Sequence, residues 1–170
     1  VCGGDGPAEH FTCDGFQPST QDALQNAVDA WFADTPSATS TYGDISDWDV
    51  SLITNMSFLF ADRDLTNSDI SSWDVSNVTN MQQMFMRTTN FSDISNWDVS
   101  SVENFINMFI YASTFNIDIS SWDVSNASNL KQMFHGADNF NQDISGWDVS
   151  NVTNMHGLFW RAGSFNADIS

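Results

Sequence analysis

The segment DISSWDVSNVTNMQQMF, residues 69–85, carries the pattern that decides the fold. Its opening motif, Asp-Ile-Ser-x-Trp-Asp-Val-Ser, occurs five times, and successive copies start 24 or 25 residues apart. The copies start at Asp44, Asp69, Asp93, Asp118 and Asp143, and Asp-Ile-Ser recurs at residues 168–170. A fixed period of this length indicates a tandem array, because one such unit cannot bury its apolar side chains alone but stacked neighbours can.

The spacing of apolar residues changes within each unit. With the first Asp of the motif as position 1, Ile, Trp and Val stand at positions 2, 5 and 7, which is typical of a short strand and its approach. Apolar residues then stand at positions 13, 16, 17 and 20, which is the spacing of a helix face. The sequence therefore predicts an α/β solenoid, a leucine-rich-repeat-like, right-handed stack of short parallel strands and short helices. The expected core tryptophans are Trp48, Trp73, Trp97, Trp122 and Trp147.

The residues before the array, 1–43, form a separate N-terminal unit. An amphipathic helix is predicted within residues 19–34, followed by a connector at 35–43. We expect this helix to cap the open end of the core. Its apolar face consists of Leu24, Ala27, Val28, Trp31 and Phe32. The array spans 44–170, with five units at 44–68, 69–92, 93–117, 118–142 and 143–167 and the start of a sixth.

Charge and composition exclude some partners. The 170 residues include 22 acidic and only 4 basic side chains, giving a net charge of −18, so we expect no binding to nucleic acid or anionic membranes. No apolar run is long enough to span a bilayer. The chain opens at Val1 without Met or a signal-like run, which we interpret as the start of a processed mature protein.

Two cysteines, Cys2 and Cys13, stand in a Gly-rich opening. With only His10 nearby they cannot complete a tetrahedral zinc site. One disulfide closing a short loop is the preferred interpretation, and it implies a secreted protein. The alternative is two unpaired cysteines in a reducing compartment.

Aspartates recur at positions 1 and 6 of the units. Stacked at strand spacing, like charges repel one another, so something must offset the repulsion. The carboxylates can accept backbone N–H bonds in Asx-turns, which we favour, or they can bind calcium between layers. The weak calcium candidates are Asp69, Asp93, Asp118 and Asp143. No other metal and no cofactor is expected.

Asparagines recur at two further positions. Position 12 holds Asn55, Asn80, Asn104, Asn129 and Asn154, which resembles the asparagine ladder of leucine-rich repeats. Acceptor sequons for N-glycosylation occur at Asn55, Asn77, Asn90, Asn126 and Asn151. Three of them share position 9, and we expect glycans there if a eukaryote secretes the chain. Asn55 is a poorer acceptor because it belongs to the ladder.

Large apolar residues recur on the predicted outer face of the helices. A solvated face would be polar, so an aligned run indicates contact with another chain, unless flanking loops cover it. The candidates for self-association are Met86, Ile106, Ile110, His135, Trp160 and Ile169, with Phe58 beside them.

The motifs WDVSNVTNM, MFxxA and FNxDIS together resemble the BspA-like, mycoplasma-lipoprotein-type surface repeat family, over residues 19–170. The resemblance implies a leucine-rich-repeat-like fold and an extracellular or cell-surface location, and it implies no reaction. No catalytic triad, zinc-protease motif or phosphate loop occurs, so no enzyme is expected.

These observations favour a structural or adhesive surface glycoprotein whose copies assemble head to tail into a filament. The alternative is a receptor-like module that binds a protein or glycan ligand on its strand face, at residues such as Ser72, Asn96 and Ser121. The partners we expect are further copies of the chain, other surface proteins or glycans.

Overall fold

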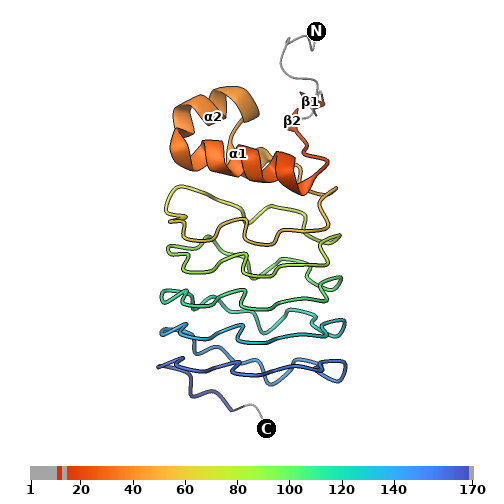
Figure 1. Cartoon of the computed structure of the whole chain (residues 1–170), viewed down its shortest axis with the longest axis vertical. Helices are drawn as coiled ribbons and strands as arrows, with labels where there is room; N and C mark the ends of the chain where they lie inside the picture. Colours follow the sequence, from red (N-terminus) through yellow and green to blue (C-terminus); the bar gives the residue numbers. More distant parts are fainter. Residues whose placement is uncertain (1–10, 13–14, 169–170) are drawn as a thin grey trace.

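The computed structural model describes residues 11–12 and 15–168. Figure 1 shows two helices lying across one end of a stack of irregular layers, which follow one another in chain order toward the C-terminus. The helices are α1 (Gln21–Ala33) and α2 (Thr35–Tyr42), followed by a short 3₁₀ helix, η1 (Ile45–Asp47). The strands are β1 (Phe11–Thr12) and β2 (Gly15–Phe16), paired antiparallel.

Helix α1 covers the N-terminal end of the stack. The Thr20 hydroxyl caps it by accepting a 3.2 Å hydrogen bond from the amide of Ala23. Its buried face consists of Leu24, Ala27, Val28 and Trp31. The indole N–H of Trp31 donates to the hydroxyl of Ser68 at 3.0 Å, at the end of the first layer. The helix predicted within 19–34 is thus present and packs on the array.

The predicted α/β solenoid of parallel strands and helices is wrong, and so is its leucine-rich-repeat-like description. In the described part of the repeats, the only helix is η1 and no residue belongs to a named strand. Successive repeats are joined by isolated parallel bridges, four of which link the position-12 asparagines. Each repeat is therefore a layer built of turns. The five layers consist of residues 44–68, 69–92, 93–117, 118–142 and 143–167.

Backbone amides explain why positions 13–20 are not helical. In the second layer the amides at positions 13, 15, 17 and 19 donate to carbonyls of the next layer, each at 2.9 Å. These donors are Met81, Gln83, Phe85 and Arg87. The amides of Met84 and Met86 instead bond to carbonyls three residues earlier. Only half of the amides thus bond within their own layer, whereas a helix would use nearly all of them internally.

Residues in the left-handed backbone conformation produce this alternation between amides bonded within a layer and amides bonded to the next layer. Positions 15 and 19 have positive φ in every layer, for example 54° at Gln83 and 53° at Arg87. Such residues reverse the chain twice and leave positions 13, 16 and 17 facing inward. These side chains are fully buried in the second, third and fourth layers, so the predicted core positions lie inside although the helix is absent.

Aromatic rings form columns through the core. The position-17 rings stack with centroids 5.5–5.7 Å apart and nearly parallel planes. The members of this column are Phe60, Phe85, Phe109, Phe134 and Phe159. The five predicted tryptophans are also buried, at 3–8% exposure. From the second layer on, each indole N–H donates to the position-2 carbonyl of the preceding layer, at 2.9–3.2 Å.

Candidate interaction surfaces

The recurring aspartates cap turns. Asp98 accepts from the Ser100 hydroxyl at 2.6 Å and from its amide at 3.0 Å, and the position-1 carboxylates accept from the amide two residues later in the same way. These bonds lower the pKa of Asp98, against an opposing effect of Asp123 in the next layer. The pKa of Asp93 is lowered likewise by the Ser95 amide and hydroxyl. The turns therefore hold the carboxylates in the charged form.

The four calcium candidates, Asp69, Asp93, Asp118 and Asp143, all use a carboxylate oxygen in such a turn. Within residues 11–12 and 15–168 there is no group of three or more His, Cys, Asp or Glu side chains that could hold a metal ion. Cys2 and Cys13 lie outside the described residues, so the structure gives the predicted disulfide no support.

The five position-12 asparagines lie in one column. Their backbones form the chain of parallel bridges from Asn55 to Asn154. Each side-chain oxygen accepts from the amide two residues later at 3.0 Å, as Asn104 does from Ile106. This bond satisfies the amide at position 14. That amide donates to no backbone carbonyl, either in its own layer or in the next one.

A second asparagine column escaped the sequence analysis. The Asn116 side chain accepts from the Asn141 amide at 2.9 Å, and the Asn141 side chain accepts from the Asn166 amide at 2.7 Å. The signal was present in the sequence, because Phe-Asn recurs at positions 23 and 24 of the last three units.

The sequon asparagines differ in what their amides do. Asn77, Asn126 and Asn151 are exposed, and each donates one side-chain N–H to a serine carbonyl in an earlier layer at 2.7–2.9 Å. Asn90 is exposed and donates to Asp64 at 2.9 Å. Asn55 is half-buried, and its amide donates to Gln21 of α1.

The predicted self-association residues do not form one exposed apolar run. Met86, Ile106 and Ile110 are half-buried, and Ile169 lies outside the described residues. His135 is buried, whereas Trp160 is 59% exposed and Phe58 46% exposed. The run therefore breaks into a few separate exposed rings.

An aromatic cluster interrupts the uniformity of the layers. The ring of His135 lies between Tyr111 and Trp160, with both ring centroids 4.9 Å away. Gly136 makes room for Tyr111, because a Cβ there would lie 2.5 Å from the tyrosine ring. The Nδ1 atom of His135 is 2.9 Å from the Gln132 amide nitrogen, and burial, with Arg161 nearby, lowers the pKa of the imidazole. Burial in the cluster therefore favours the neutral form of the His135 imidazole.

The two ends of the stack differ. At the N-terminal end, Gln21 and Gln25 of α1 donate side-chain N–H groups to the carbonyls of Ser57 and Leu59, at 3.1 and 3.4 Å. Asp29 of the same helix pairs with Arg63 at 2.7 Å. These carbonyls are the ones that accept layer-to-layer bonds elsewhere in the stack, so α1 closes this edge.

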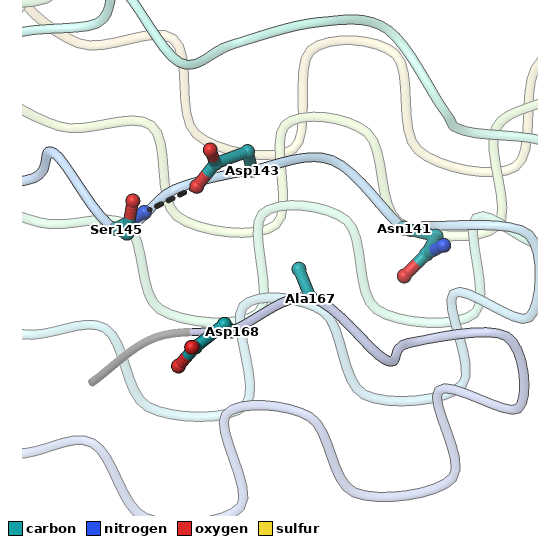
Figure 2. Close-up of a pocket in the computed structure, with 5 residues that line it drawn as sticks. All are labelled: Asn141, Asp143, Ser145, Ala167 and Asp168. Carbon is teal, nitrogen blue, oxygen red and sulfur yellow. Dashed lines mark hydrogen bonds between the residues drawn. The ribbon is translucent and has the colours of Figure 1, made fainter.

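The C-terminal end face carries two hollows. One is polar, with a volume of about 400 Å³, and Figure 2 shows Asn141, Asp143, Ser145, Ala167 and Asp168 around it. The other is apolar, with a volume of about 200 Å³, and residues of the last two layers line it. Its large side chains include Leu130, Ile144, Trp147, Met155, Leu158 and Phe159. This face is where side chains of the core reach solvent.

These features define a tandem-repeat protein of stacked, turn-built layers whose candidate sites are surfaces. A family model described as Mycoplasma protein of unknown function, DUF285, matches the chain in two overlapping segments, residues 26–120 and 88–170. The chain belongs to this family. The narrower resemblance to BspA-like surface proteins stays a prediction. No curated protein and no solved structure matches the chain. Among the described residues, no helix is long and apolar enough to cross a membrane.

Proposed function

We propose that the chain is a non-enzymatic structural and adhesive glycoprotein that works outside the cell or on its surface. The observation that carries the proposal is that the recurring polar side chains form hydrogen bonds within the stack. The recurring carboxylates accept bonds from serines of their own turns, and the recurring asparagines bond to backbone groups. These groups are bonded within the stack and stabilise it, which supports a structural role over catalysis.

The location rests on three further observations. The net charge of −18 disfavours contact with nucleic acid, and the repeats resemble those of surface proteins. Three sequon asparagines are exposed along one edge of the stack. The aspartates at positions 1 and 6 are exposed in every layer, and such a regular acidic surface suits repeated contacts with other surface molecules.

Immunolabelling of cells that make the protein tests this location. Intact cells should be labelled as strongly as permeabilised ones, and beads coated with the purified chain should adhere to those cells. Labelling that requires permeabilisation would contradict the proposal.

The head-to-tail filament is one form of this role and stays a prediction. In it, residues at the N-terminal end of one copy would cover the C-terminal end face of another, a contact that propagates without closing. Electron microscopy of the concentrated protein tests it, because only monodisperse particles would argue against a filament.

A receptor-like module is the second candidate, and the cluster of Tyr111, His135 and Trp160 favours it. The layers are otherwise nearly uniform, and this cluster is a place where their surface residues differ. Specific recognition of a ligand needs such a difference between layers. Tyr111 and Trp160 are 44% and 59% exposed, so part of each side chain is accessible to a protein or glycan ligand. Replacing Trp160 with Ala should then abolish ligand capture without loss of stability.

A further inference from the structure

One side of the stack changes its residues from layer to layer. It consists of positions 14, 15, 18 and 19, and we call it the variable side. Its residues contact one another within and between layers: Gln83 Nε2 donates to Met86 Sδ at 3.1 Å, and Arg87 pairs with Asp62 of the first layer at 2.9 Å. In layers two to four, which have a layer before and after them, none of these positions holds an acidic residue. The variable side of these layers thus lacks the negative charge that dominates the chain.

Tyr111 places an aromatic ring on this side. The residue is 44% exposed although layers lie before and after it. Its ring extends over Gly136, the residue at the same position of the next layer, where a Cβ would lie 2.5 Å from Cδ1 and 2.9 Å from Cε1. The ring of His135 supports it, with centroids 4.9 Å apart and planes at 66°. Tyr111 thus lies along the surface of the stack and forms a flat apolar platform.

Two polar atoms near this platform lack partners. In the described part of the chain, Asn107 Oδ1 and His135 Nε2 are the buried side-chain atoms that form no hydrogen bond. In the fourth layer, the position-15 amide of Gln132 lies 2.9 Å from Nδ1 of His135, at position 18. In the third layer, Asn107 instead has Ile110 at position 18, which offers no polar group. The lack of a partner for Asn107 Oδ1 therefore follows from the sequence of its own layer.

The two atoms require complementary partners. The Gln132 amide nitrogen donates to Nδ1 of His135, so the neutral imidazole carries its proton on Nε2. His135 therefore offers a donor and Asn107 an acceptor. Asn107 is only half-buried, so rotation of its side chain brings Oδ1 to the surface of the variable side. A hydroxyl group suits both atoms, because it can donate and accept.

The ligand that fits this side is uncharged. The net charge of −18 repels polyanions, whereas the basic Arg87 and Lys131 lie on the variable side and disfavour a cation. One exposed ring is also too little apolar surface for a stable protein interface, which buries about 800 Å² per partner. The C–H groups of a pyranose ring pack on an aromatic ring, and its hydroxyls bond to amides. An uncharged sugar thus matches the platform, the unpaired atoms and the charge.

We infer that the variable side of the third and fourth layers binds an uncharged glycan. One pyranose ring stacks on Tyr111, and one of its hydroxyls donates to Asn107 Oδ1. A second hydroxyl accepts from Nε2 of His135 after a small displacement of the rings that cover the imidazole. This inference names a ligand class for the adhesive role proposed above and rests on that role for its biological meaning. Binding itself is a property of the purified chain.

An array of uncharged oligosaccharides built from glucose, galactose, mannose or N-acetylglucosamine is the probe, with a galacturonic acid oligosaccharide as the anionic control. The purified chain should be retained by at least one uncharged sugar and not by the control. NMR titration with the retained sugar should shift the backbone amide signals of Tyr111, His135 and Gly136 and the side-chain amide signal of Asn107. The signal of Ser72, at position 4 of the second layer, should stay unchanged.

Matched variants test the residues of the subsite. Tyr111→Ala should weaken binding by about tenfold or more, whereas Tyr111→Phe keeps the ring and should bind within about twofold of the parent chain. Asn107→Gly should weaken binding by about threefold or more. Glycine accepts the φ of 56° at Asn107, since Gly157 has a φ of 65° at the same position of the last layer. Phe58→Ala removes a 46% exposed ring from the first layer of the same side and should leave binding unchanged.

Each outcome bears on the inference, once unchanged circular dichroism spectra show that the variants are folded. Binding of an uncharged sugar that depends on Tyr111 and shifts these signals supports it. Retention by no uncharged sugar overturns it, as do binding that Tyr111→Ala leaves unchanged, shifts confined to positions 1–8, and a preference for the anionic control. Surface labelling is measured without added sugar, so the proposed function can stand if no sugar binds, and the glycan subsite can stand if labelling fails.

Discussion

The indole N–H of Trp97 donates a hydrogen bond of 3.2 Å to the carbonyl oxygen of Ile70, one layer earlier. That carbonyl also accepts from the amide of Trp73 in its own turn, at 3.2 Å. Both of its lone pairs are therefore used, one within a layer and one between layers. A single carbonyl thus couples the local turn of one repeat to the packing of the next.

Replacing Trp97 with Phe should destabilise the chain by about 1–3 kcal/mol, because it removes the interlayer bond and part of a buried ring. Urea unfolding followed by circular dichroism measures the change in free energy. Trp160→Phe is the control, since Trp160 is 59% exposed and should change stability by less than about 0.5 kcal/mol. Equal effects of the two changes would contradict an interlayer role of Trp97.

Acid should destabilise the stack through its aspartate turns. Hydrogen bonds from serine lower the pKa of Asp93, Asp98 and Asp118 in the folded chain, below the ordinary value of about 3.9. A lowered folded pKa stabilises the chain fully above the unfolded pKa, and this stabilisation is lost as the pH falls through the folded pKa. The thermal unfolding temperature should therefore not depend on these groups from neutral pH to about pH 5. It should fall when the pH drops below about 4.

The double variant Asp98→Asn with Asp123→Asn tests the cause of this acid sensitivity. Asparagine accepts the same turn bonds but does not titrate, so the loss of stability below about pH 4 should be less steep. An unchanged slope would mean that other groups control acid unfolding.

Asn104→Ala should cost about 1–3 kcal/mol, because the amide of Ile106 loses its only acceptor at a half-buried position. Its control is Asn96→Ala, which truncates an exposed asparagine in the same layer and should be close to neutral. Denaturant unfolding of both variants gives the comparison. A neutral Asn104→Ala would show that water replaces the side chain in this column.

The sequence predicted which residues lie inside but not the backbone that puts them there. Met84 and Phe85 are buried as their helical spacing implied, because spacing records which side chains share a face. It does not record whether an amide such as that of Gln83 bonds within its repeat or to the next one. The positive φ of Gln83 and Arg87 decides that choice, and neither residue is a typical signal for a left-handed turn.

The candidate sites were predicted unevenly for a related reason. For residues that repeat, such as the position-12 asparagines, the period of the sequence alone predicts that they lie in one column. The cluster around His135 depends on Tyr111 and Gly136, which occur once each at position 19 and carry no periodic signal. The capping role of Gln21 and Gln25 likewise required the position of α1 over the first layer.

Glycan occupancy should follow exposure of the sequons. If the chain is secreted from eukaryotic cells, Asn77, Asn126 and Asn151 should carry glycans, since each side chain is exposed and one amide hydrogen suffices for its serine carbonyl. Asn55 should stay unmodified, because it is half-buried and bonded to Gln21. Enzymatic deglycosylation followed by peptide mass mapping locates the sites. A glycan at Asn55 would show that α1 closes over the first layer only after modification.

Gly136→Ala should destabilise the chain and disrupt the aromatic cluster. The φ of Gly136 is +66°, which strains any residue with a Cβ, and that Cβ would lie 2.5 Å from the Tyr111 ring. We expect a loss of about 1–3 kcal/mol, together with a change in the fluorescence of Trp160 as the Tyr111 and His135 rings move. Gly146→Ala is the matched control, because no atom lies within 4 Å of its Cβ position. It should leave both stability and fluorescence unchanged. Unfolding of the two variants at the same denaturant concentration would contradict this prediction. It would show that Tyr111 can pack beside a residue other than glycine at position 136.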